Sequence, residues 1–212
     1  VTTDADCRTS PGWIGTIAAF FHDHKPDLLV CPVTLTAQKG FLSWFQTIEF
    51  LGLQGITAGM AVIGKPVMCN GANLAFTREI YTKHRDELEF GIPTGDDVFL
   101  LHSIKRNKNN RISWLDSREA IVRTIISGSL YALLRQRARW ISKAGAYSDS
   151  YARLLAIVTF VTILVQLALL AAALYKPLFL LVFFASLVLK SIPDFLIIMN
   201  RAAFHKKKNL LW

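Results

Sequence analysis

Thr94-Gly95-Asp96-Asp97-Val98-Phe99-Leu100-Leu101 places two adjacent acidic residues before an apolar run near the middle of the chain. Adjacent carboxylates repel each other and lose hydration on burial, so a fold that gathers them usually manages a metal ion or a proton there. Residues 97–104 are apolar on one side and are predicted to form a helix. The acidic pair is therefore a candidate for part of a catalytic site.

Short apolar segments alternate with amphipathic ones on both sides of the pair. Strands are predicted at residues 28–33, at the end of 66–76, at 111–115 and at 120–126. Helices are predicted at 41–53 and from Thr77 onward, and Gly55, Gly59 and Gly64 indicate a flexible or tightly turned segment after the first of them. This alternation predicts an α/β fold.

Two other segments carry candidate metal ligands. His22-Asp23-His24 is predicted to be a solvated polar loop rather than a metal site. Val1-Thr2-Thr3-Asp4-Ala5-Asp6 resembles the last residues of a buried strand that leads into an acidic loop, with nothing before it to complete the strand. We therefore expect the chain to be the C-terminal portion of a longer protein.

The C-terminal part is apolar enough to cross a membrane twice. Between Arg153 and Lys176 lie 22 residues without a charge, which as a helix would extend about 33 Å and cover a hydrocarbon core of about 30 Å. A second apolar segment, residues 178–199, contains Lys190 and Asp194, which share a helical face. Two interpretations of this pair stay open, snorkelling near the headgroups or lining a polar cavity.

Charge is divided unevenly along the chain. Residues 1–117 carry 11 basic and 12 acidic side chains, whereas residues 118–212 carry 13 and 3. Because basic residues flank both predicted spans, the positive-inside rule puts the catalytic portion and the C-terminus in the cytoplasm. The basic tail His205-Lys206-Lys207-Lys208 is expected to bind anionic lipids. Three cysteines without CxxC spacing fit a reducing compartment and predict neither a disulfide framework nor a zinc site.

Residues 129–143 form an amphipathic segment. Gln136, Arg139 and Trp140 stand at i, i+3 and i+4 and therefore project from one helical face. A guanidinium binds oxyanions bidentately and an indole packs on a sugar ring, which suggests a phosphate clamp beside a stacking surface. The alternative is an interfacial helix with ordinary Arg and Trp anchors.

Three motifs occur in a recognisable order, Asp4-Ala5-Asp6, Gly95-Asp96-Asp97 and Gln136-Arg137-Ala138-Arg139-Trp140, and apolar spans follow them. This order resembles the membrane-bound family 2 glycosyltransferases, in particular the branch with cellulose, chitin and hyaluronan synthases and ceramide glucosyltransferases. The stretch Cys69–Phe76 also looks like the family's segment between DxD and the acidic pair. The resemblance covers essentially the whole chain.

The resemblance implies a domain order. Residues 1–126 would be the C-terminal part of a nucleotide-diphospho-sugar transferase domain of GT-A type. Residues 127–150 would be an amphipathic membrane-interface segment, and 151–212 a transmembrane hairpin with a basic cytoplasmic tail. Because the family's first aspartate and uracil-contacting strands precede the DxD motif, the 212 residues alone are expected to be inactive.

The resemblance also implies roles for single residues. Asp6 and Asp4 would hold Mg²⁺ or Mn²⁺ at the departing diphosphate, and Asp97 would be the general base with Asp96 in support. The remaining predicted site residues are Gln136, Arg137 and Arg139 for the nucleotide-sugar diphosphate, and Trp140 and Cys69 for the acceptor.

These roles describe a metal-dependent, inverting transfer of a hexosyl group from a nucleotide-sugar, first of all a UDP-sugar, to a lipid-linked or glycan acceptor at the cytoplasmic membrane face. Two spans are few to enclose a polymer channel, so single transfer is favoured over a processive polysaccharide synthase. A non-catalytic membrane subunit is the alternative of another class. Gly95-Asp96-Asp97 also marks the strand-turn-strand hairpin of RNA-dependent RNA polymerases, but without a basic channel no nucleic-acid partner is expected.

Overall fold

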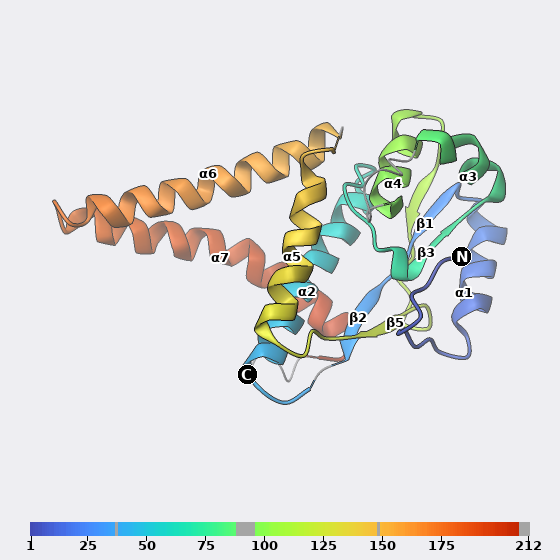
Figure 1. Ribbon diagram of the computed structural model, residues 1–212, viewed down its shortest axis with the longest axis horizontal. Coiled ribbons are helices and arrows are strands. Elements are labelled where there is room, and N and C mark those ends of the chain that lie inside the picture. The colour runs from blue at the N-terminus through green and yellow to red at the C-terminus, as the bar shows by residue number, and fades with distance from the viewer. Residues whose placement is uncertain (37, 88–95, 148, 208–212) are drawn as a thin grey trace.

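The computed structural model describes residues 1–36, 38–87, 96–147 and 149–207. Figure 1 shows a mixed α/β part from which two long helices project side by side. The α-helices and strands in chain order are α1 Trp13–His24, β1 Leu28–Val30, β2 Val33–Thr36, α2 Phe41–Val62, β3 Leu74–Phe76, α3 Arg78–His84, α4 Asp96–Arg106, β4 Ile112–Trp114, β5 Val122–Ile125, α5 Leu130–Ala144, α6 Ser150–Ala172 and α7 Leu178–Phe204.

Two small sheets carry the α/β part. β1 lies between β3 and β4, antiparallel to β3 and parallel to β4, and β2 pairs in parallel with β5. The N-terminal segment touches both sheets, because Thr2 forms a bridge with Leu74 of β3 and Arg8 forms one with Arg123 of β5. The acidic loop between Thr2 and Arg8 is thereby held across the gap between the sheets.

The core lies on both faces of β1. Side chains alternate along a strand, so Leu28 and Val30 point to one side and Leu29 to the other. Leu28 and Val30 pack with the buried faces of α2 and α4, whereas Leu29 packs against Ile17 of α1. This packing fixes α4, whose first turn carries Asp96 and Asp97.

The predicted polar loop around His22 and His24 is wrong, because both residues belong to α1. Apolar side chains at residues 13, 17, 20 and 21 have helical spacing and pack on the core. The ring of His24 stacks on Phe20 with 4.2 Å between the ring centroids. Both histidines therefore lie on the exposed side of a packed helix.

α2 is longer than the predicted helix over residues 41–53, and Gly55 and Gly59 lie inside it. The buried face continues through Thr57, Ala58 and Ala61, so packing overrides the low helix propensity of glycine. At Gly55 a Cβ atom would lie closer than 3.0 Å to a methyl carbon of α7. This glycine therefore lets the two helices approach closely, and only Gly64, with φ 72°, forms the predicted turn.

α6 and α7 form a hairpin and are each long and apolar enough to cross a membrane. In the most apolar window of either helix, none of the described residues is buried. On α7 the Lys190 Nζ lies 2.6 Å from Asp194 Oδ2, as the spacing predicted. Both side chains of this pair are exposed.

The hairpin is attached to the α/β part at the start of α6. Asp149 caps α6 by accepting from the Ala152 N–H at 2.8 Å, and its other oxygen lies 2.6 Å from Lys105 Nζ on α4. Burial alone would raise the pKa of Asp149, but the hydrogen bonds from Lys105 and Ala152 and the Lys105 charge lower it overall. The salt bridge therefore ties α6 to the helix that carries the acidic pair.

The end of α7 is attached as well. Arg201 Nη1 lies 2.9 Å from Asp116 Oδ1, and Arg118 donates to the carbonyls of Phe204 and Ala203. Figure 1 shows that α5 runs across the base of the hairpin between these two attachments.

Candidate active site

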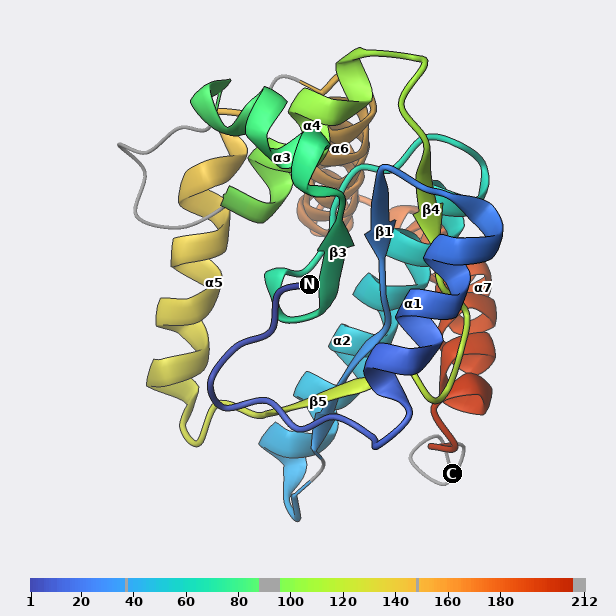
Figure 2. The ribbon, with the colours of Figure 1, turned by 90° about the vertical axis from the view of Figure 1, so that its right-hand side faces the viewer.

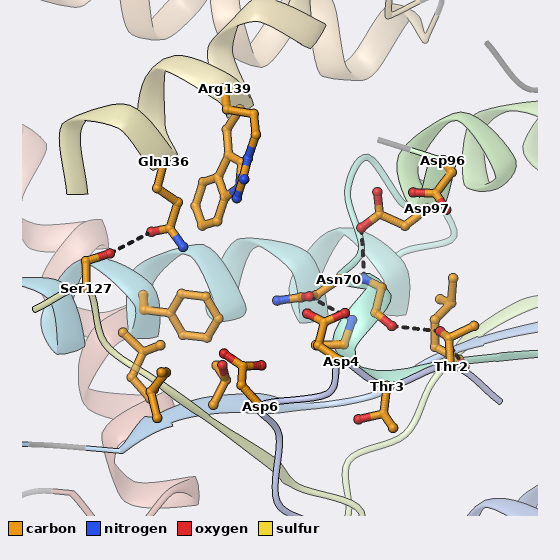
Figure 3. A pocket seen from close by; sticks show the side chains of 18 of the residues that line it. Thr2, Thr3, Asp4, Asp6, Asn70, Asp96, Asp97, Ser127, Gln136 and Arg139 are labelled. Carbon is orange, nitrogen blue, oxygen red and sulfur yellow. Dashed lines mark hydrogen bonds between the residues drawn. The ribbon is translucent and has the colours of Figure 1, made fainter. Parts of the chain in front are cut away.

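A cavity of about 850 Å³ opens between the N-terminal loop, α2, the start of α4 and α5. Figure 3 shows side chains of all these segments directed into it. Predicted site residues that line it are Asp4, Asp6, Asp96, Asp97, Gln136, Arg137, Arg139 and Trp140. The fold thus brings the three motifs into one cavity, while Thr94 and Gly95 lie outside the described residues.

The acidic loop offers a group of ligand atoms. One atom each from Asp4, Asp6 and Cys7 lies within 4.8 Å of the others. Burial raises the pKa of Asp4, and the negative charges of Asp6, Asp97 and Asp96 raise it further. A bound cation would counteract this rise, because it stabilises the ionised carboxylate. Burial also raises the pKa of the Cys7 thiol. Hard cations prefer oxygen, so the two carboxylates fit Mg²⁺ or Mn²⁺ and the thiol does not.

The carboxylate of Asp97 is held by backbone N–H groups. Its Oδ2 accepts from Gly71 and its Oδ1 from Val98, both at 2.8 Å. The backbone carbonyl of Asp97 accepts from the Cys69 thiol at 3.2 Å. Asp97 is thereby oriented, and because a carboxylate has about four lone-pair sites, it can accept further hydrogen bonds.

Cys69 differs in position from the prediction. It was expected to line the acceptor pocket, but it is not among the described residues that line the cavity. It packs instead against the core cluster of β1 and α4. Its contact with Asp97 makes it a support for the start of α4.

A buried asparagine that the sequence analysis did not single out fixes the segment around Gly71. Asn73 donates to the carbonyls of Pro32 and Ala120, each at 2.7 Å, and its Oδ1 accepts from Trp13 Nε1 at 3.0 Å. Its amide thus joins both sheets and α1. The only sequence signal was its place in the stretch Cys69–Phe76, which carried no role for the residue.

α5 presents its polar residues to the cavity in two different ways. Arg137 forms an ion pair with Glu49 of α2, with 2.9 Å between Nε and Oε1, and its guanidinium lies 4.1 Å above the Trp140 ring. Within the described part of the chain, the Arg139 guanidinium makes no hydrogen bond or ion pair. Arg139 is therefore the cation available to an oxyanion, and Arg137 holds the indole and α5 in place.

Gln46 on α2 fixes the segment that leads into α5. Its amide exchanges two hydrogen bonds of 3.0 Å with the backbone of Ser127. The Ser127 hydroxyl in turn lies 3.4 Å from Gln136 Oε1. Neither Gln46 nor Glu49 was predicted as a site residue, because each acts through a partner far away in the sequence.

Tyr147, between α5 and α6, packs against the helix that carries Asp97. Its ring meets Phe99 and His102 edge-on, with centroids 5.9 and 5.2 Å apart. Burial, then the charges of Asp97 and Cys69, raises the pKa of Tyr147 to about 12. Its hydroxyl therefore stays protonated close to the acidic pair.

The basic tail is only partly free to meet lipid. Lys207 folds back and donates to the carbonyl of Leu35 at the end of the cavity wall. Burial, then the charge of Arg123, lowers the pKa of Lys207 to about 8. Lys206 is exposed, and Lys208 lies outside the described residues.

The residues that follow the acidic pair form a helix, α4. The polymerase alternative requires a strand after the acids and is therefore wrong. Comparison with known proteins gives an independent result, since residues 1–205 match the family described as Glycosyl transferase family group 2. No curated protein matches the chain.

Proposed function

Because this chain belongs to Glycosyl transferase family group 2, we propose that it moves a sugar from a UDP-sugar to a lipid-linked or glycan acceptor at the cytoplasmic membrane face. Membership in the family itself gives glycosyl transfer between a nucleotide-sugar and an acceptor. The finer assignment rests on one observation, the cavity in which the acidic loop, the start of α4 and the Arg-Trp face of α5 meet.

The donor diphosphate would lie between the acidic loop and α5. Asp4 and Asp6 would hold Mg²⁺ or Mn²⁺, and a cation bound there neutralises charge on the departing diphosphate. Arg139 lines the same cavity and has no competing partner among the described residues, so it is free to bind a phosphate oxygen. Gln136 adds an amide beside it.

Asp97 is the proposed general base. The Gly71 and Val98 N–H groups hold its carboxylate in one orientation, and a carboxylate has enough acceptor sites to take a hydrogen bond from the acceptor hydroxyl as well. As the hydroxyl oxygen attacks the anomeric carbon, its proton passes to Asp97 and the bond from that carbon to the diphosphate oxygen breaks. A single displacement of this kind inverts the anomeric configuration. Asp96, in the same helical turn, adds negative charge that supports proton transfer.

Trp140 is the proposed wall of the acceptor site. Its indole is held by Arg137, which is held in turn by Glu49, so the flat ring is already positioned before a sugar binds. An indole face packs well on the apolar face of a sugar ring. The nearby hairpin favours an acceptor that is itself anchored in the membrane.

The test is transfer activity of the natural full-length protein in membranes, followed as release of nucleoside diphosphate from a panel of nucleotide-sugars. We expect Asp97→Asn to lower turnover by about 10²- to 10⁴-fold, the usual contribution of a general base. Asp23→Asn, an exposed acid on α1, is the matched control and should keep full activity.

Equal activity of wild type and Asp97→Asn would refute the base assignment. A wild type that releases no nucleoside diphosphate from any donor would support the non-catalytic subunit instead. Product length distinguishes the remaining alternative, because a ladder of long chains would indicate a processive synthase rather than single transfer.

A further inference from the structure

Tyr147 lies in the connection between α5 and α6 and contacts the helix that carries the acidic pair. Its ring meets Phe99 and His102 edge-on, and these two residues stand three apart on one face of α4. Tyr147 also packs on the core cluster that contains Phe99. It is not among the described residues that line the cavity, so an influence of Tyr147 on sugar transfer has to act through α4.

A segment of the α/β part, residues 66–71, also runs along α4. Near the end of α4, Lys105 donates to the Pro66 carbonyl at 2.7 Å. One turn earlier, His102 Nε2 lies 2.9 Å from the Val67 carbonyl oxygen. Burial lowers the pKa of His102, so the ring is neutral and its Nε2–H donates this hydrogen bond. These two contacts fix the second half of α4 on the segment.

The same segment reaches the start of α4. The Cys69 thiol donates to the backbone carbonyl of Asp97, and the Gly71 N–H donates to its carboxylate. The carboxylate therefore keeps its orientation only while the first turn of α4 stays on this segment. Whatever presses α4 toward residues 66–71 also determines where the carboxylate of Asp97 lies.

The connection between α5 and α6 follows α4 on another side. Beyond Tyr147, Asp149 Oδ2 lies 2.6 Å from Lys105 Nζ, and this ammonium group lies 5.1 Å from the centroid of the Tyr151 ring. Figures 1 and 2 agree that the end of α5 and the start of α6 lie next to α4. His102 and Lys105 each contact both this connection and residues 66–71, so α4 is held between the two segments.

We propose that Tyr147 is a positioning residue for Asp97. Its ring packs on the first two turns of α4 and holds them against residues 66–71, where the Gly71 N–H binds the Asp97 carboxylate. The connection that leads to the membrane hairpin would thereby determine where the base stands in the cavity. The proposal rests on the proposed function, in which Asp97 accepts the proton of the acceptor hydroxyl.

The electrostatics of the tyrosine agree with this placement. Burial first, and then the charges of Asp97 and Cys69, raise the pKa of Tyr147 to about 12. Such charge effects weaken with distance, so the tyrosine lies near the base. At neutral pH its hydroxyl is uncharged, and the contacts with Phe99 and His102 are made by the ring. The positioning role is therefore assigned to the ring rather than to the hydroxyl.

The test compares Tyr147→Leu with Tyr147→Phe in the natural full-length protein in nanodiscs. Leucine removes the aromatic edge contacts, whereas phenylalanine keeps them. We expect Tyr147→Leu to lower kcat by about 10- to 100-fold, because a shift of the base by about 1 Å is costly. The KM for the nucleotide-sugar should stay within about 2-fold, because the proposed donor ligands stand on the acidic loop and α5, not on α4. Tyr147→Phe should keep at least about half of the wild-type kcat, because the ring is retained.

Tyr151→Leu is the matched control, because it removes the same kind of ring at the other end of the contact with α4. Tyr151 stacks with Lys65 and Lys105 and not with the first two turns of the helix. This variant should keep the wild-type kcat. Melting temperatures show which variants are folded, and Tyr147→Met, which fills more of the space, takes the place of Tyr147→Leu if the leucine variant does not fold.

A second measurement reports on the start of α4 without any turnover. Cys69 is half-buried, and its thiol contacts the Asp97 carbonyl. Its alkylation rate, followed by mass spectrometry of the peptide that contains it, should rise when α4 opens more often. We expect a rise in Tyr147→Leu, and the wild-type rate in Tyr147→Phe and in Tyr151→Leu.

A folded Tyr147→Leu protein with wild-type kcat would overturn the proposal, as would a Tyr147→Phe protein that loses as much activity as Tyr147→Leu. A wild type that transfers no sugar would count against the proposed function instead. Alkylation of Cys69 would still be measurable in that case, and an unchanged rate in Tyr147→Leu would show that Tyr147 does not hold the start of α4.

Discussion

Replacing Gly55 by alanine should weaken the attachment of α7 to the α/β part, although alanine is the better helix former. A Cβ at residue 55 would lie closer than 3.0 Å to Ile197 Cγ2 and 3.3 Å from Arg201 Cγ. Carbon atoms pack at about 3.5–4.0 Å, so α7 or the Ile197 side chain must move by at least about 0.5 Å. Overpacking of this kind costs about 1–3 kcal/mol.

Gly59→Ala is the matched control, because it lies one turn away in the same helix and a Cβ there meets nothing within 4 Å. Both variants gain the helix propensity of alanine, about 1 kcal/mol. Gly59→Ala should therefore be stabilised, whereas Gly55→Ala should be neutral or destabilised by up to about 2 kcal/mol. At about 2–4 °C per kcal/mol for a chain of this size, the two melting temperatures should differ by about 2–12 °C.

The melting temperatures can be followed by tryptophan fluorescence of the protein in nanodiscs. Combining Gly55→Ala with Ile197→Ala removes the methyl carbon that would clash, so the cost of the alanine should disappear in the double variant. A Gly55→Ala variant that melts at or above the temperature of Gly59→Ala would refute the packing argument for α2 and α7.

Two further predictions concern the acidic loop and the start of α6. Asp6→Asn removes an anionic ligand and should raise the Mg²⁺ or Mn²⁺ concentration for half-maximal transfer by about 10-fold or more; a metal titration checks this, and Cys7→Ser should leave the curve unchanged. Lys105→Met removes the hydrogen bond from Lys105 Nζ to the Pro66 carbonyl and the half-buried salt bridge with Asp149, and the loss of the charged hydrogen bond to Asp149 should cost about 1.5–3 kcal/mol of unfolding free energy at pH 7. Since the folded-state pKa of Asp149 lies below its ordinary value of 3.8, that stabilisation is present above this pH and is lost as the pH falls through the lower folded-state value. The difference in melting temperature between wild type and Lys105→Met should therefore shrink in acid to the part that comes from the Pro66 hydrogen bond, and a constant difference down to low pH would contradict the pairing.

Local patterns predicted the elements that carry the motifs. α4, β4, β5, α5 and both hairpin helices follow from apolar periodicity, and each begins within a few residues of its expected start. α1 was missed because its four apolar contacts are spread among small and polar residues. The predicted helix over residues 41–53 ends too early, because glycine is a poor helix former. In the structure, the missing side chain of Gly55 allows α7 to approach α2 closely.

The motif order also predicted which segments would share a site, but not how each side chain is used. Arg137 and Arg139 look equivalent in the sequence, and only the approach of Glu49 from α2 separates a structural arginine from an available one. Asn73 could not be identified for the same reason, because its partners lie 41 and 47 residues away along the chain. Roles that depend on such distant contacts have no local signature.

The attachments at both ends of the hairpin have a further consequence. Lys105 with Asp149 and Arg201 with Asp116 attach the hairpin to the α/β part at both of its ends. In the proposed membrane arrangement, these attachments would hold the cavity at one height above the bilayer. We expect the enzyme to select acceptors first by the distance between their reactive hydroxyl and the membrane surface. Contacts between side chains and the sugar would add specificity only for acceptors whose hydroxyl reaches the cavity.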